Sequence, residues 1–379
     1  MKKILTGLLA LAASASFAQV TLFGNIDQAY VRMQQDGQTM STTASNANTT
    51  SVWGIRGGED LGKGLKANFE LRSEIQLTTG QTGSASSGLT GTNTNKPTLF
   101  NRGAYLELQD VSYGTLRVGR QPDAWWEATN EVNNVGGMAS FGFGNAISIG
   151  ANTATLANIS GVAATGLSHF GTTTQNQSYV GPGISFFGGA TYISPKISNV
   201  TVRLQTGAGK TTYADGGDIG GGEGYSVKYD DGKLKLITGS TWKNDTAGAK
   251  AWTNTMYGAT YKLDKYTLIW GKNKTTFDGL AAGNNNLKVD SYGVGYDVSA
   301  KTDIAVGWTK LQDTENSANS FTQTAVTARY KLSPRTTVYG AVGTGKNEGA
   351  AKANLIFAQA AGNAGADPRA IMVGLRHTF

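Results

Sequence analysis

The chain contains no cysteine and only two histidines among its 379 residues. Without cysteine it can form no disulfide framework, thiolate nucleophile or cysteine-ligated metal site. His169 and His377 lie in no recognisable motif, so nothing supports a Ser-His-Asp arrangement. The glycine-rich stretch 217–224 lacks the lysine of a phosphate-binding loop. We therefore expect no enzyme activity, no cofactor and no metal site.

Long apolar runs are also missing, except near the start of the chain. Two lysines precede the apolar run Ile4–Ala15, and small residues follow it. This pattern predicts a secretory signal peptide at 1–18, cleaved after Ala18, and a mature chain of 19–379. No later run approaches the ~20 apolar residues of a membrane helix. If the mature chain spans a membrane, we expect a β-barrel, the other fold that satisfies every backbone group in lipid.

Charge is scarce as well. Charged residues make up 16% of the chain, against the roughly 25% that is typical of soluble domains. Basic residues alternate with apolar ones instead of clustering with aromatic ones, so we expect no nucleic-acid partner. Removing the two lysines of the signal from the 33 basic residues leaves 31 against 26 acidic residues, a formal charge of +5. That excess is modest, and its meaning depends on where the charges lie.

The sequence does contain alternation of apolar and polar residues with a period of two, which is typical of β-strands. Near the C-terminus Ile371, Val373 and Leu375 share one parity, and the chain ends on Phe379. An unpaired edge of this kind invites aggregation, whereas the last strand of a closed barrel pairs with the first. In the segment 65–77 every even position is polar or charged, as a water-filled lumen requires.

About sixteen segments show this character, and tight turns alternate with long polar loops between them. The predicted strands lie near 20–33, 51–57, 64–78, 98–109, 114–121, 182–193, 199–208, 222–230, 232–243, 252–262, 265–274, 288–298, 302–312, 321–332, 335–345 and 369–379. Sixteen strands enclose an aqueous channel. Tyr and Trp fall near strand ends, as in the girdles of membrane barrels. Residues 34–50 and 78–97 are predicted loops, and the long piece 122–180 is expected to be functional.

Six segments carry a resemblance to a known family, and they are Val20–Tyr30, Gly54–Leu71, Phe100–Leu108, Gly114–Gln121, Tyr192–Pro195 and Val373–Phe379. Together the chain resembles a Gram-negative general diffusion porin of the beta-proteobacterial type. The resemblance implies an all-β fold, a 16-stranded antiparallel transmembrane β-barrel with short periplasmic turns and long extracellular loops. It also implies a third loop folded into the lumen, a homotrimer, outer-membrane lipid as surroundings, and passive diffusion of small hydrophilic solutes and ions.

The resemblance also places residues at a pore constriction. The third loop begins at Gln121 and would carry Asp123, Glu127 and Glu131 into the pore, together with Trp125 and Trp126. The expected basic wall residues are Arg56, Arg72, Arg102 and Arg120. Arg102 shares parity with Ala104 and Leu106, so the resemblance alone aims it inward. Glu70 and Glu74 flank Arg72 on one face, where charge balance explains them more simply than a catalytic pair.

Some positions depart from the pattern of the family. Val52 stands where such porins often have a pore arginine. Residues 184–187 also lack an arginine that such porins often have in this segment. With two tryptophans in the loop, the constriction is expected to be less basic and more aromatic than usual. Alternation predicts further inward cations at Lys66, Arg203, Lys228, Lys233, Lys235, Arg329 and Arg376. We therefore expect a weak preference for anions.

Three other functions stay open at this point. The first is a substrate-specific outer-membrane channel for aromatic or organic-acid solutes, suggested by Trp125, Trp126, Phe186 and Phe187. The second is a barrel enzyme, which would need a Ser/His pair converging on one rim. The third is an adhesion or structural barrel that does not conduct.

Overall fold

The protein is described from a computed structural model. It describes residues 20–82, 99–133, 135, 141–143, 186–207, 221–244, 250–277, 286–355 and 365–379. The predicted signal peptide lies outside these ranges. No helix within them is long and apolar enough to span a membrane.

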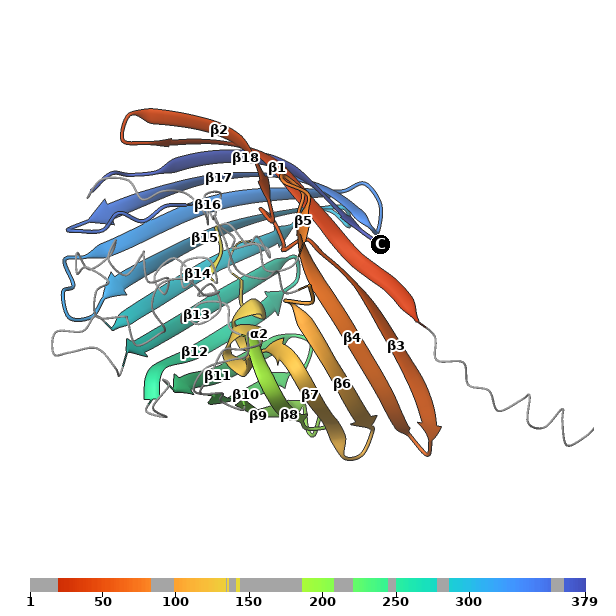
Figure 1. The fold of residues 1–379 in the computed structure, drawn as a ribbon. Coiled ribbons are helices and arrows are strands. Elements are labelled where there is room, and N and C mark those ends of the chain that lie inside the picture. The colour runs from red at the N-terminus through yellow and green to blue at the C-terminus, as the bar shows by residue number, and fades with distance from the viewer. Residues whose placement is uncertain are drawn as a thin grey trace, which may run out of the picture.

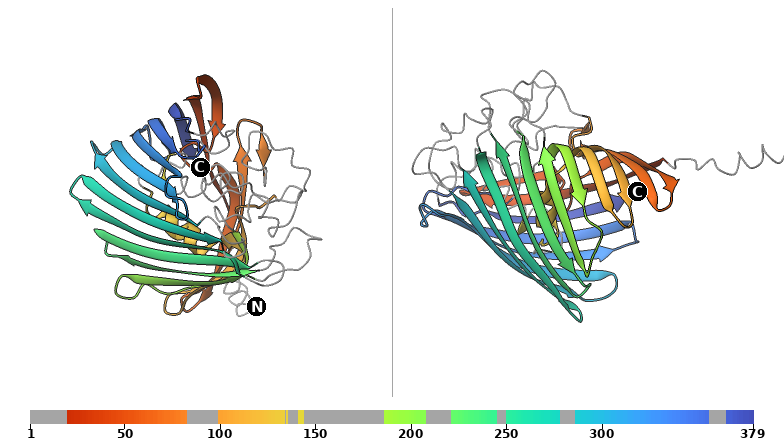
Figure 2. Two further views of the ribbon diagram at one scale, coloured as in Figure 1. Left: turned by 90° about the vertical axis from the view of Figure 1, so that its left-hand side faces the viewer. Right: turned by 90° about the horizontal axis from the view of Figure 1, so that it is seen from below.

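Sixteen antiparallel strands form a closed wall, and Figures 1 and 2 show them tilted around a common axis. In order around the wall these strands are β1 (Thr21–Gln35), β3 (Val52–Gly62), β4 (Leu65–Gln76), β6 (Gly103–Asp110), β7 (Gly114–Pro122), β8 (Phe186–Ile193), β9 (Val200–Gly207), β10 (Gly222–Asp230), β11 (Leu234–Asn244), β12 (Lys250–Leu263), β13 (Tyr266–Phe277), β14 (Leu287–Asp297), β15 (Thr302–Asp313), β16 (Ser320–Lys331), β17 (Thr336–Glu348) and β18 (Arg369–Thr378). Each of the sixteen predicted strands overlaps one of them, which confirms the expected barrel.

The barrel closes where the two ends of the chain meet. Strand β1 pairs with β18 from Asn25 opposite Thr378 to Gln34 opposite Arg369. Below this ladder the N–H of Phe379 donates to the carbonyl of Gly24 at 2.9 Å, and the N–H of Gly24 donates back at 3.0 Å. The edge predicted from the terminal strand is therefore paired, and no backbone group of the seam is left for lipid to satisfy.

Two short strands lie outside the wall order, and both fall in segments that were predicted to be loops. Residues 34–50 were expected to form a loop, but β2 (Gln38–Ser45) pairs with the upper half of β1. The hairpin turns at Asp36 and Gly37, with φ of 56° and 72°. Two consecutive positive φ values match the twist of a tight hairpin. The other addition, β5 (Gln81–Thr82), pairs with the end of β4, and 83–98 lie outside the described residues.

A second correction concerns the strand expected at 98–109. Its regular pairing begins only at Gly103, and residues 99–102 form a turn. Arg102 therefore belongs to the turn before β6 and not to the strand. The turn sets the direction of the Arg102 side chain, so the alternation of a strand does not predict it.

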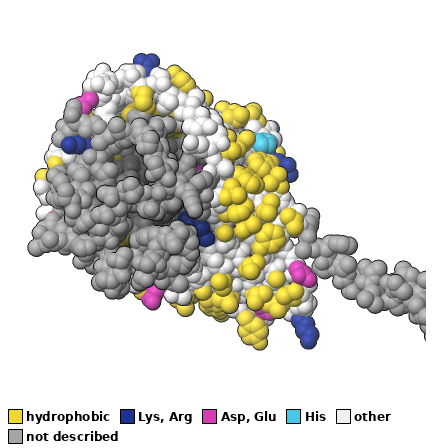
Figure 3. Space-filling view, viewed as in Figure 1, with side chains coloured by type: hydrophobic (Ala, Val, Ile, Leu, Met, Phe, Trp, Pro, Cys, Tyr) yellow, Lys and Arg dark blue, Asp and Glu magenta, His cyan; other side chains and the backbone are white. Residues whose placement is uncertain are grey.

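Alternate residues along a wall strand face opposite environments. On β18 Ile371 and Val373 are 57% and 60% exposed, while Met372 between them is 1% exposed. Figure 3 shows a mostly hydrophobic outer surface where β1, β3 and β4 lie, with charged side chains at its margin. Lipid covers such a face in a membrane barrel. Several inward residues, Met372 among them, are buried.

The apolar core lies inside the barrel. The short helix α2 (Ala124–Asn130) packs on β9, β10, β11 and β12, and Figure 1 shows it against the inner side of the sheet. Its buried residues and those after it are Trp125, Ala128, Val132, Val135, Phe141 and Phe143. They belong to the same core cluster as inward residues of the wall such as Met256 and Phe321. The third loop is thus folded into the lumen in its described parts, as expected.

We predict that Gly24→Ala destabilises the closed barrel. A Cβ at Gly24 would contact the carbonyl of Val52 and lie 2.7 Å from the ring of Phe379, so the seam must shift. Overpacking of this kind costs about 1–3 kcal/mol. The control Gly340→Ala places its Cβ 3.8 Å from the nearest neighbour. Heat-modifiable mobility on denaturing gels should show earlier unfolding of Gly24→Ala alone, and equal unfolding of both variants would contradict the prediction.

Candidate functional site

The segment that enters the lumen begins with a capped helix. Asp123 precedes α2 with an extended backbone, and its Oδ1 accepts the N–H of Trp126 at 2.6 Å. Aspartate at this position satisfies one of the free N–H groups of the first helical turn. The Asp123 side chain is 0% exposed. It was expected to project into the pore, but its described role is to begin the helix.

Hydrogen bonds then fix α2 to the inner wall. The indole N–H of Trp125 donates to Oδ1 of Asn273 on β13 at 2.7 Å, and its backbone N–H donates to Oγ1 of Thr241 at 3.2 Å. The N–H of Ala124 donates to Oε1 of Gln205 at 2.9 Å. Trp125 is 0% exposed, whereas the neighbouring Trp126 is half-buried. Of the two tryptophans expected at the constriction, only Trp126 has side-chain surface to offer a solute.

Wall glycines let the segment lie close to the sheet. A Cβ at Gly258 would lie 2.6 Å from Val132, and one at Gly239 would lie 2.9 Å from Ala128. Further along, a Cβ at Gly271 would lie 2.9 Å from Phe143, and one at Gly343 would lie 2.8 Å from Phe141. Real Cβ atoms do not approach so closely, so these positions form a glycine seat, namely Gly239, Gly258, Gly271 and Gly343. The seat sets how far the segment projects into the lumen.

The two glutamates of the segment are held by cations of the wall. Glu127 forms an ion pair with Arg203 on β9 and lies 3.8 Å from Arg117 on β7. Arg117 also pairs with Glu107 on β6 at 2.9 Å. These four side chains form an alternating chain of charges. Neighbouring strands bring Arg117 and Glu107 directly opposite each other in register.

A second ionic contact lies one helical turn further on. Nζ of Lys228 lies 2.9 Å from Oε1 of Glu131, and Lys235 contacts Oε2. Burial alone would raise the pKa of Glu131, but hydrogen bonds from Lys235 and Lys228 hold its pKa below the ordinary 4.5. The carboxylate is therefore ionised at neutral pH. Two lysines from adjacent strands clamp it against the wall.

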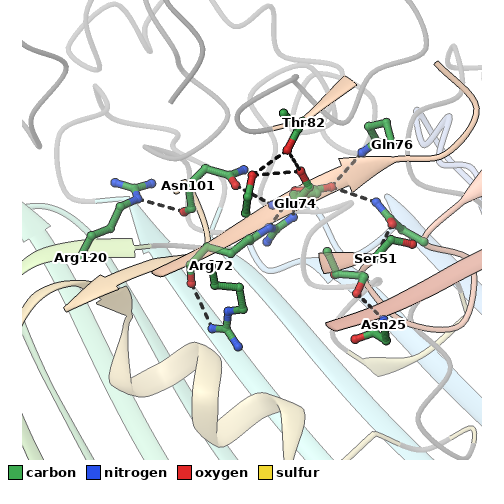
Figure 4. Close-up of polar contacts among 12 residues, drawn as sticks. Asn25, Ser51, Arg72, Glu74, Gln76, Thr82, Asn101 and Arg120 are labelled. Carbon is green, nitrogen blue, oxygen red and sulfur yellow. Dashed lines mark hydrogen bonds and ion pairs between the residues drawn. The ribbon is translucent and has the colours of Figure 1, made fainter. Parts of the chain in front are cut away.

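A separate arginine cluster lies on β3, β4 and the turn before β6, and Figure 4 shows part of it. Nε of Arg102 donates to Oε2 of Glu74 at 2.7 Å, and Glu74 is only 2% exposed. Nη2 of Arg72 donates to the carbonyl of Arg102 at 3.0 Å. Arg72 also lies 3.4 Å from Glu70. The turn expected to be part of strand β6 is what brings Arg102 to Glu74.

The remaining basic candidates join this cluster differently. Arg56 lies opposite Glu70 in the β3–β4 register, and its guanidinium lies 4.8 Å from the ring centroid of Phe23. Its side chain is exposed. Arg120 has the parity of the outward Val118, yet its Nε donates to the carbonyl of Asn101 at 2.9 Å. Arg120 therefore reaches the same turn that carries Arg102 (Figure 4).

Sequence reasoning missed some members of the site and misplaced one. Arg117 and Glu107 were not singled out, although each alternates with exposed leucine or valine along its strand. Arg203, Lys228 and Lys235 were expected to face inward, and their pairs with the loop glutamates agree with that. Lys233 does not face inward, because its Nζ lies 5.3 Å from the ring centroid of Tyr261 on the outer face. The side chains of Phe186 and Phe187 lie outside the description.

The site is thus a capped, wall-bound segment inside a closed sixteen-stranded barrel, with acidic residues on it and basic residues on the wall. The sequence matches the Gram-negative porin family over residues 5–350. It is 30% identical to outer membrane porin protein 32 of Delftia acidovorans, over the full length of both chains. This chain belongs to the Gram-negative porins.

Other comparisons agree with this. The chain is 32% identical to an outer membrane porin protein of Bordetella pertussis over 38% of this chain and 40% of that protein. The structure resembles an anion-selective porin from Comamonas acidovorans with a TM-score of 0.72, 21% identity, and coverage of 96% of this chain and 100% of that one. A trimer form of OmpT from Vibrio cholerae gives a TM-score of 0.58 at 13% identity, covering 96% and 99%.

Membership of the family places the porin in the outer membrane of a Gram-negative bacterium, with its strands crossing the lipid many times. It also assigns the function, a water-filled channel through which small hydrophilic solutes and ions diffuse passively. The long loops then lie at the extracellular end of the barrel and the tight turns at the periplasmic end.

We predict that Gly258→Ala lowers single-channel conductance. The added methyl would clash with Val132, and the wall lies behind the segment, so the segment can yield only toward the lumen. We expect a stability loss of about 1–3 kcal/mol as well. Gly295→Ala is the matched control, because its Cβ would lie 3.6 Å from Thr267. Planar-bilayer recordings in which both variants conduct like the unmodified porin would rule this account out.

We also predict that acid loosens the segment. Because the folded pKa of Glu131 is lowered, its ionised form stabilises the segment above pH 4.5, and this contribution is lost as the pH falls through the lowered pKa. Current fluctuations should therefore increase only in acid. Glu131→Gln should fluctuate already at pH 7, while Glu59→Gln, an exposed residue of β3, should behave like the unmodified porin. If Glu131→Gln and the unmodified porin are equally quiet across this range, the clamp does not hold the segment.

Proposed function

We propose that this porin is a general diffusion channel with a weak preference for anions, set by two clusters of charge in its lumen. One observation carries the proposal, which is the excess of cations over anions in both clusters. Around Glu70 and Glu74 lie Arg56, Arg72 and Arg102, an excess of one cation. Around Glu107, Glu127 and Glu131 lie Arg117, Arg203, Lys228 and Lys235, an excess of one.

The mechanism is electrostatic filtering at a narrow place. Most of the cations that line the lumen lie close to carboxylates, so the electric field between these charges runs mainly across the pore axis. This field orients polar solutes but does not bind them. The residual positive charge raises the local concentration of anions. Arg329, another predicted inward cation, pairs with Asp303 at 2.7 Å and adds no net charge. The resemblance to a porin described as anion-selective supports the same sign. No binding step or chemical step is required.

We also propose a homotrimer and a cleaved signal peptide. The apolar outer face along β1, β3 and β4 can serve as a subunit contact, and a structurally similar porin is described in a trimer form. The signal would comprise residues 1–18 and the mature porin 19–379. The native mass and the N-terminal sequence of the purified protein test these two points.

The reversal potential across a salt gradient tests the selectivity. We expect a weak anion preference that falls in Arg56→Ser and Arg72→Ser. A unit charge acting over 4 Å in water contributes about 1 kcal/mol, so each variant should change the permeability ratio by up to about fivefold. Arg335→Ser, in an exposed turn between β16 and β17, is the control and should change nothing. A cation-selective unmodified porin would overturn the proposal.

A further inference from the structure

Between β2 and β3 the chain forms a large bulge on the wall of the barrel. The pairing of β2 with β1 ends at Ser45 opposite Gln28, and β3 takes it up again at Val52 opposite Asn25. Six residues, 46–51, therefore lie opposite only two residues of β1. We call them the wall bulge. Bulges bend a strand and re-aim its side chains, and they are common beside functional sites.

Asp27 on β1 replaces the missing ladder contacts and holds the wall bulge. Its carbonyl accepts the N–H of Asn46 at 3.2 Å, and its own N–H donates to Oγ of Ser51 at 2.9 Å. Its carboxylate Oδ1 accepts the N–H of Asn48 at 3.0 Å. Asp27, Asn48 and Ser51 are at most 1% exposed. One buried residue thus fixes the start, the middle and the end of the wall bulge.

Tyr339 holds the Asp27 carboxylate from the other side of the seam. Its hydroxyl donates to Oδ1 of Asp27 at 2.9 Å, although β18 lies between β17 and β1. Gly374 of β18 makes this reach possible, because a Cβ there would collide with the Tyr339 ring. Tyr339 is 1% exposed. The hydrogen bond is therefore shielded from water, and it fixes the carboxylate on which the wall bulge depends.

The wall bulge reaches the arginine cluster through Asn46. This residue has a φ of 67°, a left-handed conformation in which asparagine is enriched. Its Oδ1 accepts the N–H of Ser51 at 2.7 Å, and its Nδ2 donates to Oε1 of Glu74 at 2.9 Å. Gln76 donates to the same oxygen at 2.8 Å (Figure 4). Oε2 of Glu74 accepts from Arg102. Asn46 thus helps to orient the carboxylate that holds Arg102.

The orientation of Glu74 decides how strongly its negative charge acts on the lumen. The carboxylate is paired with Arg102, and Glu74 is 2% exposed, so it adds little to the field at the pore surface. Without the amide of Asn46, one of its oxygens would lose a hydrogen-bond donor. A charged group that loses a buried hydrogen bond gains by turning toward water. On the inner side of the wall that water is in the lumen.

We propose that the wall bulge is a positioning device for the charges that set selectivity, with Asp27, Tyr339 and Asn46 as its positioning residues. Tyr339 holds Asp27, and Asp27 holds the wall bulge. Asn46 then holds Glu74 against Arg102. Neither Asp27 nor Tyr339 is exposed to a diffusing solute. The inference rests on the proposed function, because it identifies what keeps one of the two charge clusters in place.

Asn46→Gly tests the last contact of this chain, because glycine keeps the left-handed backbone and removes only the amide. The reversal potential across a salt gradient should shift toward cations. We expect a change of about twofold in the permeability ratio, less than the factor of about five for a deleted unit charge. Asn199→Gly is the matched control, since Asn199 is exposed, has a φ of 68° and lies in the turn before β9. It should change nothing.

The same substitution in a Glu74→Gln background separates positioning from a general loss of structure. With no charge at position 74 to expose, Asn46→Gly should leave the permeability ratio of that background unchanged. Equal shifts in both backgrounds would overturn the proposal. The comparison measures changes only, so it decides whichever ion the unmodified porin prefers. Its failure is therefore distinct from a failure of the anion preference.

Tyr339→Phe tests the distant end of the device, because it removes a buried, uncharged hydroxyl. Ser51→Ala repeats the test independently by removing another uncharged contact of Asp27. Both should shift the permeability ratio in the same direction as Asn46→Gly, and Tyr257→Phe, at an exposed tyrosine of β12, should not. Heat-modifiable mobility on denaturing gels identifies the folded variants. A folded Tyr339→Phe or Ser51→Ala with an unchanged ratio would overturn the role of Asp27.

Discussion

Every feature of this porin depends on one constraint, which is that a backbone crossing hydrocarbon must satisfy all its hydrogen bonds within the protein. A sheet meets this requirement only when its first and last strands pair. The seam between Gly24 and Phe379 completes that pairing at the very end of the chain. Closure of the barrel in turn separates an outer face in lipid from an inner face in water. Successive side chains along each strand therefore face lipid and water in turn.

The lumen is shaped by two attachments that act together. The glycine seat allows the third loop to lie directly on the wall, while Glu127 and Glu131 attach it to cations of β7 and β9 to β11. The glutamates therefore neutralise much of the wall charge beside the loop. The cluster of arginines on β3 and β4 lies elsewhere along the wall and keeps a larger share of its charge. A weak preference for anions follows from this division.

The wall strands could be predicted because their two faces meet different solvents, which imposes a period of two on the sequence. Strand β2 escaped prediction because Gln38–Ser45 is mostly polar, and its two apolar residues, Met40 and Ala44, share a face with Gln38 and Thr42. Alternation could not place Arg102, because a turn and not a strand sets its direction and brings it to Glu74. Trp125 could not be recognised as a wall contact, because its partner Asn273 lies 148 residues away. The pair Arg117 and Glu107 was within reach, since a tight hairpin places them opposite each other.

The central claim is that lipid and water alternate along each strand, and the absence of cysteine makes it directly measurable. Single cysteines can be placed at four successive positions of β6, from Leu106 to Gln109, and spin-labelled in the reconstituted porin. Labels at Leu106 and Leu108 should be accessible to dissolved oxygen, and those at Glu107 and Gln109 to a water-soluble nickel complex. Uniform accessibility at all four positions, or the reverse alternation, would contradict the account.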